Sequence, residues 1–447
     1  MANYEADSTG IDSSTVRVLI ENGEYWLTNR GDLAILDVTV RRLSERWPGA
    51  RLGVLTYAPS LLRAFAPAAE PVTYRRGSRW SRSGPWWQVP AYAGPRLVGP
   101  VSAGWWAVSD RPRHYARKVR DSLRTPTAVP DETGRIPRIP MAVRDASLVL
   151  AMGGGYMTDV DPYQAHRTLD LLERAADLHI PTAMCGQGIG PLTGEHILAH
   201  AMRVLPKVDL IAVREQERGP ALLRSLGVPS ERVVVTGDDA VELAYGMQSD
   251  TIGTDIGVCL RVAGYSPVTD RAQDVVGRVL RGFAGTVDAG LVPLIVSEYE
   301  AEDRHSTMPL VDGFPIVRPT VGRFASARDL VSEVARCRVL VTGAYHVAVF
   351  ALAQGIPVVG LSTSRYYDDK LGGLSGMFPG GVELVQLAED GLDERLTRAI
   401  HRMWREAPGL RSDLRAQARA QVSASKQAFE RVFALVESEQ SRRATER

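Results

Sequence analysis

The chain has 447 residues, of which 45% are hydrophobic and 23% charged, a composition that excludes a disordered or fibrous protein. A net charge of +1 gives no strong overall field, so we predict no nucleic-acid partner, and no apolar run reaches ~18 residues, so we predict no transmembrane segment. Three widely spaced cysteines in apolar runs fit neither a disulfide framework nor a zinc site. They are typical of free thiols in a reducing compartment, so we predict a cytoplasmic protein.

Short apolar runs alternate with longer amphipathic segments along the first half of the chain. The predicted strands are residues 16–22, 51–57, 146–153, 181–188, 208–215 and 232–238. Helical segments between most of them predict a parallel sheet with helical crossovers.

The same rhythm restarts after a break rich in Gly, Thr and Asp at 246–255, with predicted strands at 256–261, 291–297, 314–319, 338–343 and 357–362. The chain is also too long for one ordinary core. We therefore predict an α/β fold of two Rossmann-like domains facing a cleft. The predicted units are an N-terminal domain at 15–245, a C-terminal domain at 255–390, and C-terminal helices at 391–447.

An insertion at about 74–140 interrupts the first domain with a segment rich in Trp, Arg and Pro. Five of the eight tryptophans lie in it, and clustered tryptophans argue against disorder. One interpretation is a packed helical excursion with aromatic anchors. Another is an acceptor platform containing Trp86 and Trp87, because aromatic faces stack on sugar rings. A third is docking on a membrane or a partner.

Ligands of doubly wound sheets bind beyond the carboxyl ends of the strands, so the residues at those ends are the candidates. Asn29, Gly31 and Asp32 follow the first strand, where Gly31 would let a ligand approach the backbone and Asp32 suits a helix N-cap. Further along, the glycine-rich stretches add candidates for the acceptor side: Gly153, Gly154, Gly155 and Gln187. The three consecutive glycines would expose amides to a phosphate or a sugar, or would make a tight turn for packing alone.

Cationic candidates lie at strand ends on both sides of the predicted cleft. Arg214 and Arg261 each follow a strand, and a guanidinium suits phosphate. Tyr345 and His346 begin the helix after strand 338–343, where free amides favour an anion. We expect His346 to hold a donor phosphate or transfer a proton, and its loss to leave the fold stable. Lys370 would reach the same pocket unless Asp368 and Asp369 neutralise it.

Six motifs in this order resemble the polysaccharide pyruvyl transferase family: "NRGDLAIL", "AMGGGYMTD", "CGQGIGPL", "LIAVREQE", "VTGDDA" and "YHVAVFALAQGIPVVGL". The resemblance covers about residues 20–386 and implies a GT-B-like fold and transfer of the enolpyruvyl unit of phosphoenolpyruvate onto a sugar, with no metal. It also implies an Arg-x-His pattern at the donor site. His346 matches the histidine and Arg214 the arginine of the "VRE" motif, but Ala344 stands where the second arginine is expected.

Three functions remain open, and we expect no metal and no cofactor in any of them. Because Ala344 weakens the case for phosphoenolpyruvate, we favour glycosyl transfer from a nucleotide-sugar to a small-molecule or glycan acceptor, with His346 and Asp32 as catalytic residues. The alternatives are pyruvyl transfer, with Arg214, Arg261 and Lys370 supplying the missing charge, and a non-catalytic sugar-binding protein. Asp159 and Asp161 have a D-x-D spacing, which we interpret as a loop and helix-cap feature.

Overall fold

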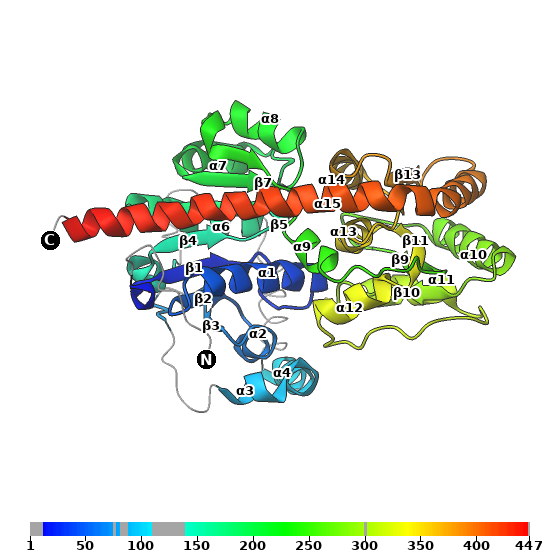
Figure 1. The fold of residues 1–447 in the computed structure, drawn as a ribbon, viewed down its shortest axis with the longest axis horizontal. Coiled ribbons are helices and arrows are strands. Elements are labelled where there is room, and N and C mark those ends of the chain that lie inside the picture. The colour runs from blue at the N-terminus through cyan, green and yellow to red at the C-terminus, as the bar shows by residue number, and fades with distance from the viewer. Residues whose placement is uncertain (1–11, 75–76, 81–87, 110–138, 299–301, 446–447) are drawn as a thin grey trace, which may run out of the picture.

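The computed structural model describes residues 12–74, 77–80, 88–109, 139–298 and 302–445. Two separate parallel sheets organise these residues, and helices pack on both faces of each sheet (Figure 1). This is the predicted α/β fold with two facing Rossmann-like units and a helical C-terminus.

The first sheet has eight strands, in the order β3-β2-β1-β4-β6-β7-β8 with β5 paired to β6. Its strands are β1 (Arg17–Glu21), β2 (Arg51–Leu55), β3 (Ala69–Val72), β4 (Leu148–Ala151), β5 (Gly154–Met157), β6 (Thr182–Ile189), β7 (Leu210–Val213) and β8 (Val233–Val235). Alternation places Val18 and Ile20 in one core cluster and Leu19 in the other, so both faces of the sheet are buried. We call residues 12–245 the first half.

Helices of the first half are α1 (Arg30–Arg46), α2 (Pro59–Phe65), α3 (Val89–Ala93), α4 (Pro95–Ser109), α6 (Pro162–Asp177), α7 (Glu195–Val204), α8 (Arg218–Ser225) and α9 (Ala240–Tyr245). Side chains of α6 and α7 join the core cluster on one face of the sheet, and those of α1 and α9 join the cluster on the other face.

The second sheet has five strands, in the order β10-β9-β11-β12-β13. Its strands are β9 (Asp255–Cys259), β10 (Leu291–Pro293), β11 (Cys337–Thr342), β12 (Val358–Ser362) and β13 (Val382–Gln386). The accompanying helices are α10 (Asp270–Thr286), α11 (Glu302–Val311), α12 (Ala327–Val334), α13 (Tyr345–Ala353) and α14 (Arg365–Met377). We call residues 255–390 the second half. The core cluster on α1 and α9 continues into α12 and α13, so the two halves share apolar contacts.

The predicted C-terminal helices are one helix, α15 (Leu392–Thr445), 54 residues long. It begins on the second half and ends on the first, as Figure 1 shows in red. Leu396 and Ile400 join the core of the second sheet, and Phe429 and Val432 join the cluster on α1. None of the helices in the described ranges has the length and apolar character needed to cross a membrane.

Several predicted elements differ from the structure. The predicted strand at 314–319 is only an isolated bridge between Val317 and Leu291. Strands β3, β5 and β13 were not predicted, because β3 is short and contains Glu70 and Pro71, and β5 begins within the glycine run.

Candidate functional site

The two halves meet where the loop before α1 pairs with the chain after β10. The backbone N–H of Arg30 donates to Val296 O at 2.9 Å, and that of Glu298 donates to Thr28 O at 3.1 Å. Asn29 forms an antiparallel bridge with Ser297 and also caps α1, because its Oδ1 accepts a hydrogen bond from the Gly31 N–H. The N-cap is therefore Asn29 rather than Asp32, which lies in the first turn of the helix.

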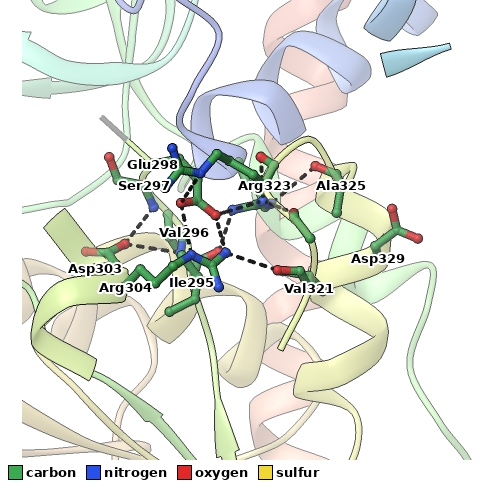
Figure 2. Close-up of polar contacts among 12 residues, drawn as sticks. Ile295, Val296, Ser297, Glu298, Asp303, Arg304, Val321, Arg323, Ala325 and Asp329 are labelled. Carbon is green, nitrogen blue, oxygen red and sulfur yellow. Dashed lines mark hydrogen bonds and ion pairs between the residues drawn. The ribbon is translucent and has the colours of Figure 1, made fainter. Parts of the chain in front are cut away.

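Arg30 fills this seam, which we call the Arg30 seam. Its guanidinium donates at 2.5–3.2 Å to four carbonyl oxygens of the second half, those of Ile295, Gly322, Arg323 and Ala325. It also lies 3.4 Å from Oε1 of Glu298, a buried carboxylate that pairs with Arg304 as well, as Figure 2 shows. Arg30 is 1% exposed, so its charge is enclosed and each of its donor groups is satisfied.

His346 lies in the first turn of α13, as predicted, and its ring packs against Gly31 of the first half. A Cβ at Gly31 would lie 2.0 Å from Nδ1 of His346, so the space beside Gly31 belongs to this ring and not to a ligand. His346 is 9% exposed, and its Nε2 has no hydrogen-bond partner within the described residues and lies 3.8 Å from Asp238. The ring is therefore part of the packing between the two halves, and the stability of the fold without it stays a prediction.

Arg214 follows β7, and its guanidinium lies against two glycines. A Cβ at Gly188 would lie 2.6 Å from its Nη2 and one at Gly155 3.0 Å, so both positions must lack a side chain. The guanidinium lies over the ring of Tyr345 at 4.1 Å and is 3.5 Å from Asp238. Tyr345 is thus a buried support for Arg214.

Lys370 reaches the same place from α14. Its Nζ would lie 3.1 Å from a Cβ at Gly155, so the ammonium lies close to the Arg214 guanidinium. The neighbouring carboxylates turn away, because Asp369 pairs with Arg218 and Asp368 accepts a hydrogen bond from Gln386. Across the described chain no carboxylate forms an ion pair with Lys370, whose ammonium lies over the ring of Tyr366 at 4.3 Å.

The electrostatics of this cluster favour a bound anion. Burial lowers the pKa of Lys370 well below its ordinary value, and the positive charges of Arg214 and Arg261 lower it further. Burial also lowers the pKa of His346, and the same neighbouring cations add to the effect, so this histidine is neutral at pH 7. An anion among these groups would relieve the repulsion between their positive charges and raise the pKa of Lys370.

Asp32 faces the same cations from the first turn of α1. Burial raises its pKa to about 8, and the carboxylates of Glu24 and Asp238 raise it further, while Lys370 and Arg214 oppose the shift. At neutral pH Asp32 is therefore mainly protonated and is a potential proton donor. Gly155, Arg214, Lys370, His346 and Asp32 together form what we call the cation cleft.

The remaining predicted residues lie outside this cluster or serve it indirectly. The guanidinium of Arg261 is held by Asp303 through hydrogen bonds of 2.5 and 2.9 Å, so it acts on the cleft through its charge. Gly153 and Gly154 are buried against neighbouring chain rather than open to a ligand. Gln187 is 0% exposed and donates to Met152 O. Trp86 and Trp87 lie outside the described residues.

The two aspartates with D-x-D spacing have ordinary structural roles. Asp161 caps α6 by accepting from the Gln164 N–H, and Asp159 accepts from the Thr193 N–H and hydroxyl. Within the described ranges, no group of three or more His, Cys, Asp or Glu side chains is arranged to hold a metal ion.

Sequence reasoning missed Arg30, Glu24 and Asp238 as parts of the candidate site. Arg30 stands inside the quoted motif "NRGDLAIL", but its partners are 265–295 positions further along the chain. Asp238 follows β8 within the motif "VTGDDA", so the rule about strand ends points to it as well, although it is not among the predicted site residues.

Comparisons with known proteins show the family and the fold of this chain. The model of the polysaccharide pyruvyl transferase family matches residues 29–365, and no curated protein matches the sequence. Three solved structures have a similar fold, each with 12% sequence identity. A Listeria monocytogenes protein assigned as a UDP-N-acetylglucosamine 2-epimerase has a TM-score of 0.55 over 96% of this chain and 97% of its own.

The second structure is the Neisseria meningitidis UDP-GlcNAc 2-epimerase bound to UDP-GlcNAc, with a TM-score of 0.53 over 94% of this chain and 99% of its own. The third is the UDP-N-acetylglucosamine 2-epimerase of Rickettsia bellii, with a TM-score of 0.51 over 95% of this chain and 97% of its own. At such low identity these likenesses establish the GT-B-like fold alone.

Proposed function

Because the chain belongs to the polysaccharide pyruvyl transferase family, we propose that it transfers the pyruvyl unit of phosphoenolpyruvate to a sugar and forms a ketal. The observation that carries this proposal is the cation cleft. There the Lys370 ammonium lies beside the Arg214 guanidinium, and no carboxylate forms an ion pair with Lys370 within the described residues.

Phosphoenolpyruvate suits this arrangement because it is small and carries both a phosphate and a carboxylate. Each charge-assisted hydrogen bond to such a group contributes about 1.5–3 kcal/mol. Lys370 supplies from α14 a cation that Ala344 does not supply from α13. The missing charge at Ala344 is the reason for favouring a nucleotide-sugar. Because Lys370 supplies a positive charge at this place, we favour phosphoenolpyruvate instead.

The proposed reaction needs a proton at one carbon and removes one from each of two hydroxyl groups. A sugar hydroxyl oxygen bonds to C2 of phosphoenolpyruvate while the methylene carbon accepts a proton and becomes a methyl group. A second hydroxyl then replaces the phosphate, which leaves with the remaining proton as inorganic phosphate. Protonated Asp32 is our candidate donor to the methylene carbon, and its carboxylate would afterwards accept a hydroxyl proton.

His346 has a separate proposed role as a neutral hydrogen-bond donor. Its Nε2 lacks a partner within the described residues, and the free amides of the first turn of α13 add further donors beside it. If hydrogen-bond donation alone matters, His346→Gln should retain part of the kcat/KM that His346→Ala loses, and this loss should be about 10²-fold. Measuring phosphate release by both variants at matched folded concentration tests this role.

Isothermal titration of the purified chain with phosphoenolpyruvate and with UDP is the direct test of the donor. We expect phosphoenolpyruvate to bind and Lys370→Met to weaken it by about 10- to 100-fold, the loss of one charge-assisted contact. Lys207→Met is the matched control, because Lys207 is surface-exposed and pairs with Glu173 away from the cleft. Tight UDP binding without any response to phosphoenolpyruvate would reject the proposal.

Glycosyl transfer from a nucleotide-sugar is the second candidate. Tyr265 is stacked near Tyr367 at 6.3 Å and meets Tyr366 edge-on at 6.1 Å, beside the start of α14. Tyr265 is 38% exposed, so this aromatic group offers a surface on which a nucleobase could stack. Under this alternative, Tyr265→Ala should weaken UDP binding and leave phosphoenolpyruvate binding unchanged.

A further inference from the structure

Three aromatic side chains lie at the carboxyl edge of the first sheet. Trp26 follows β1, Tyr57 follows β2, and Tyr163 lies in the first turn of α6, after β5. The ring centroids of Trp26 and Tyr57 are 5.6 Å apart, at an interplanar angle of 51°. Tyr163 is 69% exposed, and the other two side chains are half-buried. We call Trp26, Tyr57 and Tyr163 the aromatic rim.

A buried arginine connects Tyr163 with the other two rings. The guanidinium carbon of Arg167 lies 5.5 Å from the ring centroid of Tyr163 and 3.6 Å from that of Tyr25. The ring of Tyr25 in turn meets Tyr57 edge-on at 5.1 Å. Arg167 is 6% exposed, and its Nε has no hydrogen-bond partner within the described residues. The aromatic rim therefore has a positive charge behind it, which attracts the faces of these rings.

A buried carboxylate fixes this support. Glu21 is 0% exposed and accepts hydrogen bonds from the hydroxyl of Tyr25 at 2.5 Å and from Nε2 of Gln164 at 2.7 Å. It also lies 4.0 Å from Nη2 of Arg167. These contacts join the end of β1 to the first two turns of α6. Because the rings rest on a fixed network, they should lose little conformational entropy when a ligand binds.

Two segments of the chain connect the aromatic rim with the cation cleft. The loop after β1 carries both Trp26 and Glu24, whose carboxylate accepts from the Trp26 N–H at 3.0 Å and acts through its charge on Asp32. The other segment begins at Gly155 of the cleft and continues through the rest of β5 to Tyr163. Ligands of doubly wound sheets bind at this carboxyl edge, so a molecule on the rim would lie on the same edge as the bound donor.

We propose that the aromatic rim is the acceptor subsite and that it binds a pyranose ring by stacking. A pyranose has an apolar C–H face that suits an aromatic ring, and it has hydroxyl groups that need polar partners. The carboxylates of Glu24 and Asp161 lie in the same two segments as the rim. A lipid chain would offer these groups no hydrogen bond. The inference rests on the proposed function only in requiring a sugar acceptor, so it holds for either donor.

Saturation-transfer NMR of the full chain with methyl β-pyranosides of glucose, galactose and mannose tests the subsite. We expect at least one of these glycosides to bind at about 10 mM, with the strongest transfer to the C–H protons of one ring face. Tyr163→Ser removes the exposed ring and should weaken this binding by about 3- to 10-fold. Tyr163→Phe keeps the ring, so it is the matched control and should bind like the unchanged chain.

Donor binding separates a failure of the subsite from a failure of the proposed reaction. In isothermal titration, phosphoenolpyruvate should bind Tyr163→Ser as it binds the unchanged chain. Glycoside binding that depends on the Tyr163 ring, without any response to phosphoenolpyruvate, would support the subsite and reject the proposed donor.

Three results would overturn the subsite. The first is no transfer to any of the three glycosides, and the second is equal glycoside binding by Tyr163→Ser and the unchanged chain. The third is an equal loss of binding in Tyr163→Ser and Tyr163→Phe, because the ring face would then not be the contact. Circular dichroism of each variant ensures that only folded protein is compared.

Discussion

The two halves of the molecule meet at two arginine-containing clusters that differ in how their charges are matched. In the Arg30 seam, the guanidinium has four carbonyl oxygens and the carboxylate of Glu298 around it. In the cation cleft, Arg214 and Lys370 lie together with a mostly protonated Asp32, and no carboxylate pairs with Lys370 in the described chain. A cluster whose charges are paired stabilises the contact between the halves. A buried cluster with surplus positive charge destabilises the free protein, and a bound anion can remove that destabilisation.

The largest expected effect concerns the matched cluster. Arg30→Ala leaves Glu298 with less compensation and several carbonyls without a donor, so we expect the free energy of unfolding to fall by about 3–5 kcal/mol. Urea denaturation measures it. Arg96→Ala is the control, because Arg96 forms an exposed ion pair with Asp329 and its loss should change stability by under about 1 kcal/mol. Equal effects of the two variants would contradict the contrast between the clusters.

The next effect concerns the contact between the halves at Gly31. Gly31→Ala would place a Cβ 2.0 Å from Nδ1 of His346, so we expect the free energy of unfolding to fall by about 1–3 kcal/mol. Gly285→Ala on α10, where nothing lies within 4 Å, should be neutral or stabilising. Adding His346→Ala to Gly31→Ala should recover part of the loss, and a strictly additive double variant would rule out this contact as the cause.

The pH dependence of stability tests the charge state of Asp32. Its pKa is about 8 in the folded chain against an ordinary value of 3.8, so between these pH values the folded state binds more protons than the unfolded state. The free energy of unfolding should therefore fall as pH rises from about 4 to about 8, and level off above. Asp32→Asn should lose this contribution. Thermal melts of both proteins across this range measure the difference, and parallel curves would mean that Asp32 titrates normally.

The smallest effect on stability is expected at Lys370. Lys370→Met removes a half-buried ammonium that has no carboxylate partner in the described residues, so the free energy of unfolding should stay the same or rise by up to about 1 kcal/mol. This outcome contrasts in sign with Arg30→Ala. Urea denaturation without ligand checks it, and a large destabilisation would mean that Lys370 is a structural cation like Arg30.

The sequence predicted those features that depend on local pattern. Apolar runs located most strands of both sheets, and the rule about strand ends selected Arg214 and His346, which the structure brings to one cleft. The same rule also selected Arg261, and here it could not show that Asp303, 42 residues further on, holds its guanidinium.

Features that depend on distant contacts were not predictable. Gly31 packs against His346 of the other half, and Arg30 donates hydrogen bonds to loops of the second half. The sequence of a short polar strand such as β3 does not show the pattern of a strand. Its extended conformation depends on pairing with β2 and not on its own composition.

The long helix α15 has a consequence for the order in which the chain becomes complete during synthesis. At about 80 Å, it carries its final turns back to the first sheet, whose strands are made long before them. Phe429 and Phe433 cover Trp47 and the apolar side of α1, so that side stays uncovered until these two residues have left the ribosome. A nascent chain lacking these final turns should therefore expose apolar surface and attract chaperones, although every strand of its first sheet has already left the ribosome.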